Sequence, residues 1–113
     1  MGDRRDSPRI PIALMVRYPG AGDSFEEREG DVGLGGVYFE ERSEPQGSGV
    51  ELRFKLPTVQ DEVRCEGEII RVSQEGEGVF GVHVRFGELP TEIERAIARF
   101  IDDHELSRAK QEA

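Results

Sequence analysis

Six short stretches of the chain have the hydrophobic spacing of β-strands. In the clearest one, four apolar residues alternate with charged residues between Val50 and Leu56, which is typical of a strand with one buried face. Turns rich in glycine separate the stretches, and such turns favour short antiparallel strands. The expected strands cover residues 10–18, 25–32, 37–39, 50–56, 63–72 and 79–86. The chain is therefore expected to be mainly β, as a six-stranded antiparallel β-barrel or sandwich.

The fifth stretch departs from strict alternation. Two large apolar residues, Ile69 and Ile70, are adjacent, so a regular strand would turn one of them away from the core. This slip in parity indicates a β-bulge or a change of burial at that point.

After Gly87 the hydrophobic spacing becomes helical. Thr91 and Glu94 match a capping box, with Thr91 as the N-cap. The apolar stripe of this helix is expected to cover an open side or mouth of the barrel. Its members are Ile93, Ile97, Phe100 and Ile101. The residues that follow are polar apart from Leu106, and we expect them to fray or to extend the helix into solvent.

Length and composition limit the class of protein. The 113 residues correspond to one domain, with a flexible arginine segment (1–9), a barrel with its helix (10–103) and a polar tail (104–113). The net charge of −9 argues against DNA as a partner, because DNA-binding surfaces neutralise phosphates. The single cysteine excludes a disulfide framework, and no apolar run is long enough to cross a membrane. We therefore expect a soluble, cytoplasmic protein without membrane insertion.

The first 20 residues differ from this acidic body, because four arginines give them a net charge of +2. Arg5 and Arg9 form an RxxxR pattern preceded by Arg4, immediately before the first strand. Arginine suits forked recognition of phosphates and purine edges. The alternative is a solvated, frayed terminus without a ligand.

A second pattern, Asp31-x-Gly33-x-x-Gly36, lies between the second and third strands. An aspartate in such a turn can accept hydrogen bonds from a guanine edge, and the glycines allow close backbone approach or a positive φ. The alternative is a plain glycine turn with an Asx hydrogen bond.

The two patterns together, in this order and on this plan of strands, resemble the PilZ domain family of bacterial cyclic di-GMP receptors. The family signature is RxxxR before the first strand and D/N-x-S-x-x-G after the second, on a six-stranded barrel with a C-terminal helix. Arg5 and Arg9 match the first motif, Arg4 matches an arginine often found before it, and Asp31 and Gly36 match the second. The resemblance implies that the chain binds cyclic di-GMP, usually as an intercalated dimer, and signals to a protein partner.

Gly33 departs from the family, which has serine at this position. Loss of one hydrogen bond to a charged ligand costs about 1.5–3 kcal/mol, or about ten- to a hundredfold in affinity. Gly33 is expected still to offer its N–H, and a water could fill the gap, so the departure predicts weaker binding and not its loss. The alternative function is a PilZ-like adaptor that regulates motility or another process by protein contact without the nucleotide.

Other residues point to no further chemistry. His83 and His104 lack additional ligands at metal-binding spacing, and Cys65 has the context of a small core residue. We therefore expect no metal, no cofactor and no enzymatic activity. The partner, the pathway, the ligand stoichiometry and the oligomeric state are not encoded in any recognisable pattern.

Overall fold

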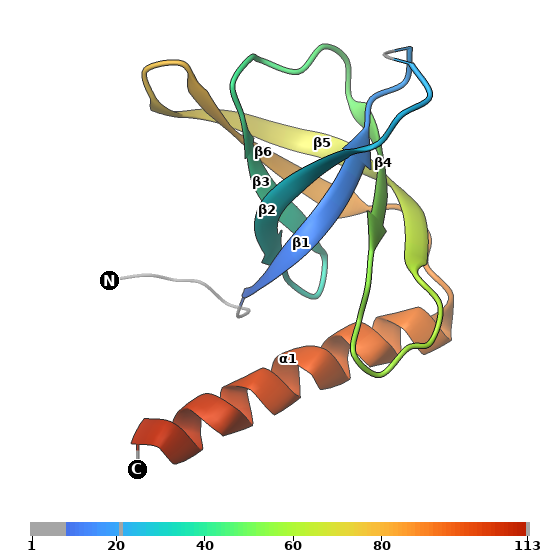
Figure 1. Cartoon of the computed structure of the whole chain (residues 1–113), viewed down its shortest axis with the longest axis vertical. Helices are drawn as coiled ribbons and strands as arrows, with labels where there is room; N and C mark the ends of the chain where they lie inside the picture. The colour runs from blue at the N-terminus through green and yellow to red at the C-terminus, as the bar shows by residue number, and fades with distance from the viewer. Residues whose placement is uncertain (1–8, 21, 113) are drawn as a thin grey trace.

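The computed structural model describes residues 9–20 and 22–112, with side chains as far as Ser107. Six strands and one helix form in the predicted order (Figure 1). Their bounds are β1 Ile10–Arg17, β2 Glu26–Val32, β3 Gly36–Glu41, β4 Gly49–Phe54, β5 Val63–Gly76, β6 Val79–Phe86 and α1 Thr91–Glu112. The strands are antiparallel and close into a barrel in the order β1-β2-β3-β6-β5-β4. The mainly β, six-stranded barrel with a C-terminal helix is confirmed.

The apolar residues that alternate along the strands fill the interior of the barrel. Leu14, Phe39, Leu52 and Val82 are at most 1% exposed and meet in one core. Each comes from a different strand, so the core depends on the closed arrangement rather than on any single hairpin.

Helix α1 crosses below the end of the barrel at which β1 begins (Figure 1). Ile97 and Ile101 are buried in the same hydrophobic cluster as the strands, so the stripe covers a barrel mouth as expected. The helix continues through residues 104–112, which settles the choice between fraying and extension for that part of the polar tail.

The start of α1 differs from the prediction by one residue. The carbonyl oxygen of Pro90 accepts hydrogen bonds from the backbone N–H groups of Ile93 and Glu94. Pro90 therefore occupies the N-cap position, and Thr91 is already inside the helix.

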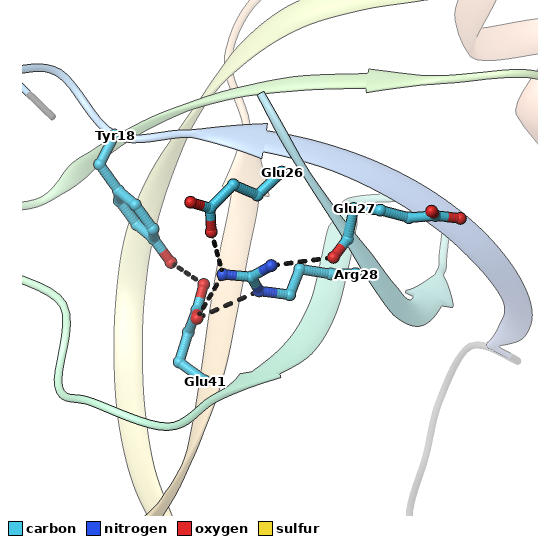
Figure 2. A network of polar contacts seen from close by, with 5 residues as sticks. All are labelled: Tyr18, Glu26, Glu27, Arg28 and Glu41. Carbon is cyan, nitrogen blue, oxygen red and sulfur yellow. Dashed lines mark hydrogen bonds and ion pairs between the residues drawn. The ribbon is translucent and has the colours of Figure 1, made fainter. Parts of the chain in front are cut away.

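At the barrel end remote from α1, one buried carboxylate is held by two partners (Figure 2). Glu41, 9% exposed, is the only buried charged or polar residue in the described part of the chain. Tyr18 donates its hydroxyl to Glu41 Oε2 at 2.7 Å, and Arg28 donates Nε and Nη2 to Glu41 Oε1 at 3.1 and 3.0 Å. Both carboxylate oxygens are satisfied, as a buried charge requires.

Candidate functional site

A row of polar side chains crosses four adjacent strands on the outer face of the barrel. Asp31 of β2 lies opposite Tyr38 of β3. Tyr38 also lies opposite His83 of β6, and His83 lies opposite Arg71 of β5. Strands are spaced by about 4.8 Å, so this row spans about 14 Å. The neighbouring row faces the core and consists of Val32, Val37, Val84 and Ile69.

Arg9, the last residue before β1, lies over this outer row. Its guanidinium carbon is 5.8 Å from the centroid of the Tyr38 ring, within range of a cation–π contact. The rings of Tyr38 and His83 are in turn 4.9 Å apart and tilted by 59°. The second RxxxR arginine therefore stands beside the outer row that contains Asp31.

Two members of the row have altered pKa values. Burial lowers the pKa of His83 from its usual value, and the positive charges of Arg71 and Arg9 lower it further. Burial, assisted by a hydrogen bond to Glu40, raises the pKa of Tyr38 to about 12. At neutral pH the row therefore offers a neutral imidazole and a protonated phenol between its arginines.

The glycine turn is fixed by close contacts with β6. A Cβ atom on Gly36 would lie 1.8 Å from the carbonyl oxygen of Val84, so only glycine fits there. Gly33 and Gly36 both have negative φ, and the alternative of a left-handed backbone at these residues is wrong. The turn also bonds to β6 through the carbonyl of Gly35, which accepts the N–H of Phe86 at 2.9 Å.

The backbone N–H of Gly33 is not free for a ligand. It donates to the carbonyl oxygen of Gly36 at 2.8 Å. The expectation that this N–H replaces the missing serine is therefore wrong, because the turn itself uses the donor. A water in place of the serine hydroxyl, or another group near the turn, is left to compensate.

A hollow of about 440 Å³ lies between Arg9, the glycine turn and strands β5 and β6. Its charged residues, within the described ranges 9–20 and 22–107, are Arg9, Arg71 and Arg85, of which Arg85 pairs with Glu68. Leu34 and Ile70 also line it and are 52% and 57% exposed. In a chain with a net charge of −9, this combination of guanidinium groups and exposed apolar surface suits an anion with a flat apolar part.

Three of the predicted site residues line the hollow, and Asp31 lies outside its lining. Arg9, Gly33 and Gly36 line the hollow, and Asp31 lies next to Tyr38 in the outer row. Arg4 and Arg5 fall outside the described residues.

Sequence reasoning missed Tyr38, Arg71 and Arg85 as members of this region. The only signal for Arg71 in the sequence is the slip in parity just before it, at Ile69 and Ile70.

Other kinds of site have no counterpart among the described residues. No group of three or more histidine, cysteine or acidic residues there could hold a metal ion. That part of the chain also has no helix that combines the length and the apolar character needed to span a bilayer.

Comparison with known proteins identifies the family. The PilZ domain model matches residues 3–103. The chain belongs to the PilZ domain family. PilZ domains are cyclic di-GMP receptors and adaptors, not enzymes. No curated protein matches the chain.

Solved structures share this fold at low sequence identity. The Bacillus subtilis inhibitor of motility (MotI/DgrA) has a TM-score of 0.71 at 13% identity, covering 93% of this chain and 53% of that one. MrkH of K. pneumonia with c-di-GMP has a TM-score of 0.66 at 14% identity, with coverages of 97% and 55%. YcgR of Escherichia coli with c-di-GMP has a TM-score of 0.65 at 19% identity, with coverages of 96% and 49%. The chain thus spans about half the length of these proteins.

Proposed function

We propose that this PilZ domain is a receptor that binds cyclic di-GMP and passes the signal to a protein partner. The observation that carries the proposal is the convergence of both motifs: Arg9 and the turn from Gly33 to Gly36 line one hollow. Two structural neighbours, MrkH and YcgR, are complexes with c-di-GMP, which supports the same ligand here.

The side chains suit the parts of this ligand. Arg9, together with Arg4 and Arg5, supplies guanidinium forks for phosphates and for the O6 and N7 edge of guanine. Asp31 accepts hydrogen bonds from N1–H and the amino group of guanine, which adenine cannot provide in the same arrangement. The Arg9 guanidinium lies over the Tyr38 ring and lines the hollow, which places it within reach of a ligand there.

Signalling follows from where the ligand binds. The arginine segment would be drawn against the barrel wall when the nucleotide is taken up, which changes the shape and charge of that surface. A protein partner can read this change. Because the ligand is a bacterial second messenger, we propose a cytoplasmic location for the receptor.

Calorimetric titration tests the proposal. Cyclic di-GMP should bind to the wild type, and Arg9→Ala or Asp31→Ala should weaken binding about ten- to a hundredfold, since each removes hydrogen bonds to a charged or polar ligand edge. Arg64→Ala is the matched control, because Arg64 is an exposed strand arginine outside the hollow. Cyclic di-AMP serves as the control ligand. No heat from the wild type at high micromolar cyclic di-GMP would overturn the proposal.

The variant Gly33→Ser tests the departure from the family motif. Gly33 has negative φ, so serine can adopt its backbone conformation. If the missing hydroxyl limits affinity, the variant binds cyclic di-GMP about ten- to a hundredfold more tightly. An unchanged Kd means that the ligand draws no hydrogen bond from this position.

A further inference from the structure

Strand β5 contains a bulge that turns two consecutive side chains outward. The pairing of β5 with β6 shifts register between Ile69 and Arg71. In a regular strand Ile70 and Arg71 would point to opposite faces, yet both are exposed and both line the hollow. Bulges are a common means of aiming a side chain at a functional site.

Arg71 also differs from every other strand arginine in its partners. Each of the other five strand arginines forms an ion pair with a glutamate. These five are Arg17, Arg28, Arg53, Arg64 and Arg85. Arg71 forms no ion pair with any residue between 9 and 107 that the structure describes. On so acidic a chain, Arg71 and Arg9 bring two guanidinium groups to the same hollow.

The surroundings of Arg71 supply apolar contacts as well as charge. Leu34, from the glycine turn, and Ile70 are two of the three exposed large hydrophobic residues in the described chain, and both line the same hollow. An exposed apolar pair next to a guanidinium provides a surface for one face of a base and a fork for its edge or for a phosphate.

We propose that Arg71 is a further ligand-binding residue of this site, which contacts a phosphate or guanine edge of cyclic di-GMP from the side opposite Arg9, with Ile70 and Leu34 packed against the base. This inference rests on the proposed function and extends it to a second wall of the site. It also supplies the compensation that Gly33 cannot give, because the Gly33 N–H is used within the turn.

Titration of the full chain with cyclic di-GMP tests this inference, using the wild type, Arg71→Ala, Arg71→Lys and the control Arg64→Ala. Arg64 lies on the same strand and is likewise exposed. Arg71→Ala should raise the Kd about ten- to a hundredfold. Arg71→Lys should fall between the wild type and Arg71→Ala, because lysine keeps the charge and loses the fork. Arg64→Ala should bind as the wild type does.

The outcomes separate this inference from the proposed function. Wild-type binding with an unchanged Kd for Arg71→Ala would overturn the role of Arg71 and leave the receptor function standing. Absence of wild-type binding would overturn both. Thermal melting of each variant serves as the folding control: the exposed Arg71 side chain predicts an unchanged Tm, and a large drop in the Tm of Arg71→Ala would contradict the inference by making the residue structural.

Discussion

At the scale of single residues, Gly36 leaves the least space for a side chain among the glycines whose surroundings are described. Its missing side chain lets β3 approach β6 closely, since an added Cβ would meet the Val84 carbonyl oxygen at 1.8 Å. Gly35, its neighbour, has open space around the same position. The two glycines look alike in the sequence and have different structural roles.

Substitution of these two glycines tests that difference. Gly36→Ala should destabilise the fold by about 3 kcal/mol, because the methyl group collides with a backbone atom that cannot move aside cheaply. Gly35→Ala should change the free energy of unfolding by less than about 1 kcal/mol. Urea denaturation measures both, and equal effects would contradict the close contact at Gly36.

The Tyr18–Glu41 hydrogen bond predicts a pH-dependent stability. Burial and the bond to Glu41 raise the pKa of Tyr18 above its usual range, whereas an unfolded tyrosine titrates near pH 10. A raised pKa in the folded state means that the stabilisation is complete below about pH 10 and is lost as the pH rises above that value.

Tyr18→Phe is the variant that isolates this contribution. It leaves Glu41 Oε2 without its donor (Figure 2), so the free energy of unfolding at pH 7 should fall by about 1–3 kcal/mol. Above pH 10 its stability should decline less steeply than that of the wild type. Parallel pH curves from denaturant titrations would show that Tyr18 does not titrate in this way.

The residues of the site were only partly predictable from sequence. Arg9, Asp31, Gly33 and Gly36 stand out because motif spacing selects them, and the fold brings them to one side of the barrel. Arg71 does not stand out, because its place depends on a non-local pairing: β5 and β6 form a hairpin, but only the pairing of β6 with β3 brings Arg71 into the row of Tyr38 and Asp31.

At the scale of elements, the strands and the helix were predictable because alternation and helical spacing record which face is buried. The adjacent Ile69 and Ile70 predict either a β-bulge or a change of burial, and the register shift confirms the bulge. The ends of the strands are harder to predict from the sequence. β3 extends to Glu41 and β5 to Gly76, beyond their predicted stretches, since pairing with β6 stabilises residues whose own hydrophobic pattern is weak.

The packing of helix α1 over the barrel mouth can be tested by substitution. Ile97 is 1% exposed in the core, whereas Leu106 is 62% exposed. Ile97→Ala should therefore lower the free energy of unfolding by about 2–5 kcal/mol, and Leu106→Ala should change it by less than about 0.5 kcal/mol. Similar losses from the two variants, measured by denaturant unfolding, would contradict the placement of this helix over the barrel mouth.

At the scale of the whole molecule, the charge is unevenly distributed in a way that favours an anionic ligand. The chain carries −9 overall, yet among the residues that the structure describes only arginines contribute charge to the lining of the hollow. Five strand arginines are paired locally with glutamates, whereas Arg9 and Arg71 line the hollow together.

This distribution predicts a salt dependence. Raising the salt concentration from about 0.1 M to about 1 M shortens the screening length from about 10 Å to about 3 Å, so the Kd for cyclic di-GMP should rise. The increase should be smaller for Arg71→Ala, which has one charge fewer at the site. Titrations at both salt concentrations measure it, and a salt-independent Kd would exclude a main contribution from the arginines.

The most direct measurement of the central claim is an NMR titration of the isotope-labelled chain with cyclic di-GMP. If the outer row and the glycine turn form the binding site, the largest amide shifts occur at Gly33, Gly36, Tyr38, Arg71 and His83. The amides near Tyr18 and Glu41, at the other end of the barrel, stay in place. Shifts concentrated at that other end, or no shifts at saturating ligand, would contradict a nucleotide site built from these two motifs.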